Sequence, residues 1–269
     1  MALSLTYNGV DLSGSSYGVT VVRGPMQVAG PSQLFYHNTP ARHGGFAAGT
    51  GFYEPRIIEC TLHVLGTSWS NLKTKLDNLS FAMRPELGNV AIVFDNASDR
   101  RWVGMFMGDI AETPIGNGAV QFTARFLVPS GLAESASAIT QSVTINENPE
   151  LFNVPASGSV AGTTHALPVW KFRNTDSTTI TTFSIGNITT QEGMTVNYSI
   201  PQNAYVKVDT ERELILYSAD DTDYTVIMSA RSDTTKTFPR LVPGSANAIG
   251  VEGFVAGTLS IDYRARYLR

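Results

Sequence analysis

Apolar and polar residues alternate with a period of two along most of this 269-residue chain. Residues 58–64, 120–128 and 259–267 show the alternation most clearly. Successive side chains of a strand point to opposite faces of a sheet, so the pattern predicts strands with one buried and one solvated face. Further short strands are predicted at 17–23, 89–94, 101–107, 168–174, 179–185, 194–199, 204–208, 213–217 and 224–229. Short strands separated by turn sequences are typical of antiparallel sandwiches or barrels.

One segment has a helical period instead. Its apolar residues recur at spacings of three and four: Trp69, Leu72, Leu76, Leu79 and Met83. This predicts an amphipathic helix whose stripe is buried. Thr67 or Ser68 can cap its first turn, and Pro85 ends it because proline disfavours helical geometry in the preceding residue. Phe81 lies off the stripe, as either a peripheral core contact or an exposed anchor for a partner.

The length is that of two domains. A small, polar stretch at 131–138 follows a strong predicted strand, so we expect an N-terminal domain over 1–130, a linker over 131–138 and a C-terminal domain over 139–269. Residues 1–130 hold 9 basic and 9 acidic side chains, and the remainder holds 10 and 14, a net charge of −4. The segment 25–55 lacks periodicity and predicts a long loop, a kind of segment that is commonly functional or ordered by a partner.

Composition and charge exclude several classes of function and of site. Charged residues make up 16% of the chain, against about 25% in typical domains, which favours a surface packed against other subunits. The net charge of −4 gives no electrostatic footprint for a nucleic-acid binder. No apolar run approaches the roughly 18 residues of a membrane span. Cys60 is the single cysteine, which excludes an internal disulfide and a cysteine-based zinc site.

The motifs that could carry catalysis lack their context. Gly14-Ser-Ser16-Tyr-Gly18 matches the nucleophile elbow of hydrolases, but a predicted strand follows where the elbow requires a helix, so a Ser/Gly turn is favoured. The histidines show no metal-ligand spacing: His37, His43, His63 and His165. The run Asp220–Asp223 imitates a calcium loop without its glycine or its final glutamate. We therefore predict no catalytic residue, no metal and no cofactor.

Several segments nevertheless stand in an order typical of one family. They are Asn8-Gly-Val-Asp-Leu12, Pro40–Gly45, Arg56–Val64, the capped helix, Val90–Phe94, Arg100–Gly104, Ala166–Pro168, Val208–Glu211, Phe238–Asn247 and the closing strand. In this order the whole chain resembles the siphophage distal tail protein family. The most specific segment is Phe238–Asn247. We interpret these motif residues as specifying the fold rather than binding a ligand, because glycine permits positive φ and proline stiffens a turn: Asn8, Gly9, Phe238, Pro239, Leu241, Pro243, Gly244 and Asn247.

The resemblance implies a mainly β protein. Its N-terminal domain would be antiparallel β with one helix and build a six-fold ring, and its C-terminal domain would be a galectin-like or carbohydrate-module-like β-sandwich facing outward. It also implies a virion component that is assembled in the host cytoplasm and joins the tail tube to the baseplate or tail tip. The implied partners are the tail tube protein, the tape-measure and tip hub proteins, and receptor-binding or fibre proteins.

Residue types add candidate contacts and competing functions. Phe81, and Arg42 with His43 in the long loop, are predicted to lie at a partner interface. The first alternative is an adhesion protein whose outer β-sandwich binds host glycan. The second is a hydrolase acting through Ser16.

Overall fold

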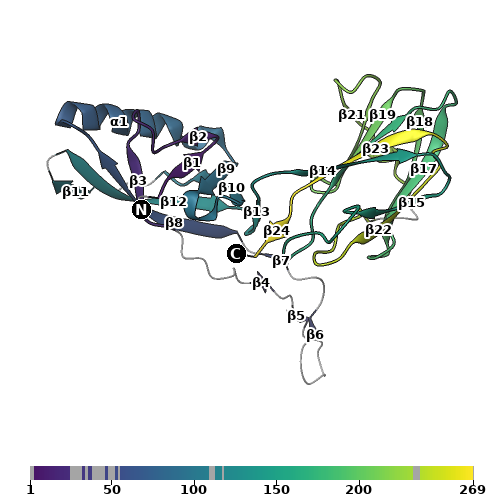
Figure 1. Cartoon of the computed structure of the whole chain (residues 1–269), viewed down its shortest axis with the longest axis horizontal. Helices are drawn as coiled ribbons and strands as arrows, with labels where there is room; N and C mark the ends of the chain where they lie inside the picture. The colour runs from purple at the N-terminus through teal and green to yellow at the C-terminus, as the bar shows by residue number, and fades with distance from the viewer. Residues whose placement is uncertain are drawn as a thin grey trace. The chain divides into compact units, whose positions relative to one another are not determined.

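The computed structural model describes residues 3–24, 32–33, 36–37, 46–47, 52–53, 55–108, 113–116, 118–232 and 237–268 (Figure 1). The chain forms two compact units. The first comprises Met1–Ala136 together with Tyr267–Arg269, and the second comprises Ser137–Arg266. The chain therefore passes from one unit to the other twice, and both of its ends belong to the first unit.

The first unit is built on one antiparallel sheet. Its strands follow the order β2 (Val10–Asp11), β1 (Leu5–Tyr7), β9 (Val90–Phe94), β10 (Arg100–Phe106), β12 (Ala119–Val128), β8 (Arg56–Leu65) and β3 (Val19–Arg23), with β11 (Thr113–Gly116) paired to β12. The longest ladder joins β8 and β12 over ten residue pairs. Leu3, next to β1, also bridges Val21 in β3. The sheet thus curls until its two ends approach each other.

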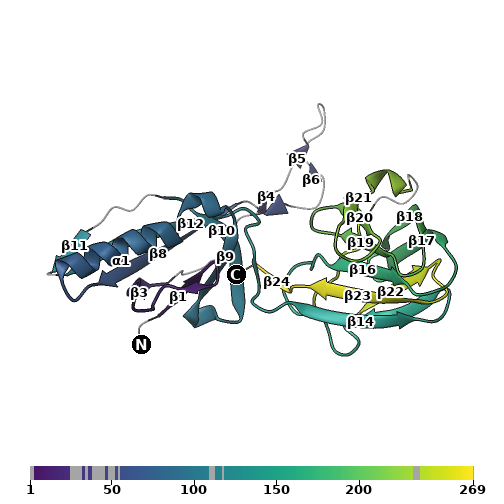
Figure 2. The same cartoon turned by 90° about the horizontal axis from the view of Figure 1, so that it is seen from above.

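The predicted alternation decides which side of β8 and β12 is buried. Ile58, Cys60, Leu62 and Val64 are at most 2% exposed, as are the facing residues Val120, Phe122, Ala124, Phe126 and Val128. Helix α1 (Trp69–Ala82) runs alongside the sheet in Figure 2 and adds Leu72 and Leu79 to the same core. The short 3-10 helix η1 (Pro85–Leu87) follows α1, and η2 (Asp95–Ala97) follows β9.

The ends of α1 confirm the helix prediction, but one stripe residue was assigned wrongly. The Ser68 hydroxyl accepts a hydrogen bond from the backbone N–H of Asn71 at 3.2 Å, which caps the first turn. Trp69, predicted to be buried, is 68% exposed. The chain turns from β8 into α1 so tightly that a Cβ on Gly66 would lie 2.7 Å from Leu72. Leu72 therefore fills the end of the core, and Trp69 is left outside.

Residues 131–136 of the predicted linker belong to the first unit, and Ser137 and Ala138 belong to the second. Strand β13 (Ala133–Ser135) pairs with β10 and with β24 (Arg266–Tyr267). Ala133 is fully buried, and Glu134 accepts two hydrogen bonds from the Arg101 guanidinium, at 3.0 and 3.2 Å. The division between the units consequently falls after Ala136, because small and polar residues are held in a strand by tertiary pairing.

The second unit is a β-sandwich. One sheet has the order β14 (Ile139–Ile145), β23 (Gly257–Tyr263), β16 (Val169–Asn174), β19 (Tyr205–Asp209), β20 (Leu214–Ser218) and β21 (Thr225–Val226). The other has the order β15 (Glu150–Val154), β22 (Asn247–Glu252), β17 (Ile180–Asn187) and β18 (Glu192–Ile200). Phe254 lies 5.4 Å from Phe172 and 5.3 Å from Phe183 between ring centroids, within the shared core. The mainly β fold with one α-helix in the described residues agrees with the prediction.

Two predicted segments differ in detail. The strand expected at 224–229 is β21 followed by the 3-10 helix η3 (Met228–Ala230). The long loop expected at 25–55 contains two nested antiparallel pairs: β4 (Ser32–Gln33) with β7 (Phe52–Tyr53), and β5 (Tyr36–His37) with β6 (Phe46–Ala47). Arg42 and His43, predicted at a partner interface, lie outside the described residues. In the described part of the chain no helix is long and apolar enough to cross a membrane.

Candidate functional site

The Gly14–Gly18 motif forms a turn and not a nucleophile elbow. The backbone N–H groups of Tyr17 and Gly18 both donate to the Gly14 carbonyl, at 3.0 and 2.7 Å, and strand β3 follows. Asn78 of α1 donates to the Ser16 carbonyl at 3.1 Å. The elbow requires a helix directly after the serine, so the turn interpretation holds and its contacts are structural.

His63 and Asp221, two of the titratable residues singled out in the sequence, are engaged by other side chains. His63 and Gln121 form a 2.8 Å hydrogen bond across β8 and β12. Asp221 pairs with Lys171 at 2.9 Å and accepts a hydrogen bond from Tyr224. Burial raises the pKa of Cys60 to about 12, so this thiol stays protonated at neutral pH. Among the described residues, no group of three His, Cys, Asp or Glu side chains could hold a metal ion.

The Phe238–Asn247 segment is held by its own unit. Asn247 is fully buried, and its Oδ1 accepts hydrogen bonds from the Val242 N–H at 2.8 Å and from Asn187 at 3.0 Å. The Arg240 guanidinium and backbone N–H donate to the Glu192 carboxylate, with Nε at 2.8 Å and N at 3.0 Å. These polar groups bind one another, which supports the fold-specifying interpretation of this motif.

The other motif residues lie where backbone geometry needs them. Asn8 and Gly9 have φ of 51° and 77° in the turn between β1 and β2, and such angles favour these two residue types. Gly244 has φ of 79° and donates its N–H to the Val160 carbonyl at 2.8 Å. Leu241 is fully buried and exchanges two backbone hydrogen bonds with Ala166.

An aromatic side chain with a cation on it projects from α1. Phe81 is 69% exposed. The guanidinium carbon of Arg84 lies 4.1 Å from the centroid of the Phe81 ring, and Arg84 Nη1 donates to the Phe81 carbonyl at 2.8 Å. We call Phe81 and Arg84 together the knob. Exposed aromatic residues and arginine are the types enriched at the centres of protein interfaces.

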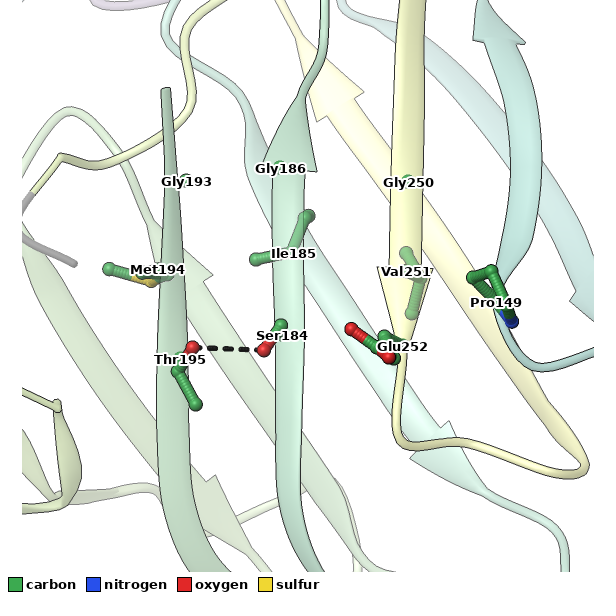
Figure 3. Close-up of a pocket in the computed structure, with 10 residues that line it drawn as sticks. All are labelled: Pro149, Ser184, Ile185, Gly186, Gly193, Met194, Thr195, Gly250, Val251 and Glu252. Carbon is green, nitrogen blue, oxygen red and sulfur yellow. Dashed lines mark hydrogen bonds between the residues drawn. The ribbon is translucent and has the colours of Figure 1, made fainter. Parts of the chain in front are cut away.

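A shallow hollow of about 320 Å³ lies on the outer face of the sheet β15-β22-β17-β18 (Figure 3). Its floor is a row of three glycines, because Gly186 pairs with Gly193 on one side and with Gly250 on the other. Along one side run Ser184 and Thr195, whose hydroxyls are 2.9 Å apart, as well as the exposed Glu252. We call this hollow the trough. Sequence reasoning missed it because glycines far apart in the chain become neighbours only through strand register.

Comparison with known proteins identifies the fold. No family model and no curated protein matches the sequence. Among solved structures, the SPP1 Dit protein, described as a paradigm of the hub adsorption apparatus in phages infecting Gram-positive hosts, matches with a TM-score of 0.72 and 15% identity over 99% of both chains. Two structures of the phage P2 baseplate in its activated conformation also match over nearly the full length. The calcium form has a TM-score of 0.54 and 10% identity over 98% of both chains, and the strontium form has 0.50 and 10% over 97%.

At this level of identity the comparison concerns architecture. The alignment runs through both units, so the pairing of a curled sheet carrying one helix with a β-sandwich is shared over the whole chain. The architecture expected from the order of the motifs, an antiparallel β unit with one helix followed by a β-sandwich, is therefore confirmed.

Proposed function

We propose that this protein is the structural hub at the distal end of a long non-contractile phage tail. Six copies would form a ring that joins the tail tube to the baseplate or tail tip and its host-recognition proteins. The observation that carries the proposal is the likeness to a phage hub protein over 99% of both chains, with both units included. A function carried by one unit alone would not require the other unit to be present in both proteins.

The chemistry of the surface supports an assembly protein. Only 16% of the residues are charged, and His63 and Asp221 are engaged by other side chains. Trp69 and Phe81 expose about two thirds of their surface on one helix. Large exposed apolar side chains that gather on one element mark interaction surfaces.

We assign the ring to the first unit and an outward position to the second. Residues 137–266 hold 9 basic and 13 acidic side chains, a net charge of −4, whereas the rest of the chain holds 10 of each and is neutral. Six acidic units repel one another when they are crowded around an axis, so the neutral unit is the better inner element. The outer units would then be free to hold receptor-binding or fibre proteins.

The trough gives no support to the glycan-binding alternative. None of its ten lining residues is aromatic, so it offers no ring on which a sugar could stack. A glycan array with the full-length protein separates the two functions. Specific glycan binding by a protein that forms no ring would favour the adhesion alternative.

Negative-stain electron microscopy of the purified full chain tests the hub. We expect closed rings with six subunits at sufficient concentration, and ring-sized particles in light scattering. The Phe81→Ala variant should form rings only at higher concentration, because it lacks an exposed contact of the helix. Monomers alone at high concentration, with and without the tail tube protein, would contradict the proposal.

A further inference from the structure

We propose that the trough receives the knob of a neighbouring copy of this chain. The inference rests on the proposed ring and goes beyond it, because it adds to a ring built by the first units a contact between the first unit of one copy and the outer unit of the next. The knob belongs to the first unit and the trough to the second, so each copy carries both halves of the contact. A contact between two different patches repeats around an axis and closes a ring when the rotation allows it.

The row of glycines on the floor of the trough is the first observation that supports this contact. A Cβ added at Gly186 would meet its nearest neighbour, the Glu192 carbonyl, at 3.5 Å, and one at Gly250 would meet Leu151 Cδ2 at 3.4 Å. Both are ordinary contacts, and neither glycine has a positive φ. The fold of the unit thus accepts a side chain at both positions, although a glycine within a strand costs about 0.5–1 kcal/mol relative to alanine. Such a glycine is typical of a site that another group approaches closely.

The third glycine of the floor is different. A Cβ on Gly193 would lie 3.0 Å from the Ile185 carbonyl and 3.2 Å from the Gly186 Cα, so backbone contacts within the unit already disfavour a side chain at this position. At Gly186 and Gly250, in contrast, contacts within the unit do not account for the absence of a side chain. These are therefore the two positions that an occupant of the trough would cover.

The size and lining of the trough indicate the occupant. Its 320 Å³ is at the small end of the roughly 300–1,000 Å³ of ligand sites, which suits one or two side chains. The exposed side chains Leu151 and Ile188 come within 3.4 and 3.7 Å of the Cβ position of Gly250. A flat aromatic ring can lie on the glycine floor, between these two apolar side chains. Aromatic side chains stabilise glycines in sheets by covering them in this way.

The charged groups beside the trough and on the knob indicate which aromatic ring the trough receives. Glu252 is exposed beside the floor and has no ion pair among the residues that the structure describes. Arg84 is stacked on Phe81 and likewise has no acidic partner within those residues. When the free part of the Phe81 ring lies on the glycines, its attached guanidinium can reach the carboxylate. Arginine and carboxylate pair with directional, charge-assisted hydrogen bonds.

Filling the trough tests the contact in the full-length protein. In the Gly186→Val variant the valine side chain occupies the floor, and we expect self-association measured by sedimentation to weaken about tenfold or more, as for loss of an interface anchor. Thr182→Val is the matched control, because Thr182 lies exposed on the same strand outside the trough. The control should associate like the unchanged protein, and circular dichroism should show both variants folded.

A charge exchange tests the pairing itself. Arg84→Glu and Glu252→Arg should each weaken self-association, and the double variant should recover most of it because the pair is restored with reversed charges. Both positions are at the surface, so this test remains decisive even if Gly186→Val does not fold.

The outcomes separate this contact from the hub function. If six-membered rings form and neither Gly186→Val nor the charge exchange alters self-association, the knob-and-trough contact is wrong and the hub remains. The contact is also wrong if Gly186→Val affects only the binding of another tail protein. If the unchanged protein forms no ring under any condition, the hub proposal and the contact fall together.

Discussion

Side chains that share one sequence pattern differ in what they contribute to the fold. Trp69 and Leu79 belong to the same apolar stripe, yet Trp69 is 68% exposed and Leu79 is 1% exposed. Hydrophobic stabilisation is proportional to the apolar area removed from water. The contribution of each residue is therefore set by its place over the sheet and not by its place in the stripe.

Leu79→Ala should lower the free energy of unfolding by about 2–5 kcal/mol, through lost burial and the cavity left behind. Trp69→Ala, at an exposed position, should change it by no more than about 0.5 kcal/mol. Urea unfolding followed by fluorescence and circular dichroism measures both. Equal losses for the two variants would show that Trp69 is covered in the folded chain.

The Glu192–Arg240 pair makes stability depend on pH. Burial raises the pKa of Glu192, but the hydrogen bonds from Arg240 outweigh burial and hold the pKa below its ordinary value. A lowered folded-state pKa stabilises the fold above the ordinary value of about 4.3, and this stabilisation is lost as the pH falls through the folded-state pKa.

The melting temperature should consequently fall as the pH is lowered from about 5 to 3, and it should fall less in Glu192→Gln, which has no carboxylate to protonate. Glu147→Gln is the control, because it removes an exposed carboxylate from the same unit. Scanning calorimetry over this range measures the slopes. A steeper slope in Glu192→Gln than in the unchanged protein would contradict the prediction.

At the scale of elements, the helix shows what local sequence can specify. Its start is set by Ser68, whose hydroxyl accepts the N–H of Asn71, and its end precedes Pro85. Both signals act between residues close in sequence, so they operate wherever the helix is placed.

Ser68→Ala should lower the free energy of unfolding by about 1 kcal/mol, because an N–H of the first turn loses its partner. Ser68→Asp should keep most of the stability, since aspartate caps as well as serine. Thermal melts of the three proteins measure the order. Equal stability of the alanine and serine forms would mean that water satisfies the N–H at no cost.

Strands show the limit of local sequence. Strands β14 and β22 were missed, and in each of them a polar residue stands among the apolar residues on the inward side. Gln141 of β14 donates to the Asn153 carbonyl of β15 at 2.8 Å and accepts from the N–H of Ala156, just beyond β15, at 3.0 Å. Asn247 of β22 is fully buried. The hydrogen-bond partners of these two side chains lie on other segments of the chain. Tertiary contacts therefore explain why the apolar–polar alternation is interrupted in β14 and β22.

For the molecule as a whole, the return of the C-terminus matters most. Strand β24 pairs with β13, and the ring of Tyr267 lies 4.2 Å from the guanidinium carbon of Arg100. The last residues thereby complete the first unit, although the sequence assigned them to the second domain.

Tyr267→Ala should lower the melting temperature by several degrees, through loss of about 1 kcal/mol of stacking and burial. Tyr267→Phe is the matched control and should melt like the unchanged protein, because the ring that contacts Arg100 is retained. Scanning calorimetry of the full chain provides the measurement. No shift in the alanine variant would mean that the tail contributes nothing to the first unit.

The sequence by itself determined the fold class, the buried faces of β8 and β12, the capped helix and the order of a helix-bearing β unit followed by a β-sandwich. Each of these depends on period-two or period-3.6 burial, on capping between near neighbours, or on the order of motifs. Tertiary structure alone decided that 133–135 is a strand, that Trp69 is exposed, and that Gly186 lies between Gly193 and Gly250. Those outcomes depend on strand register between segments distant in the chain, and register is set by the summed packing of the whole sheet and not by any local run of residues.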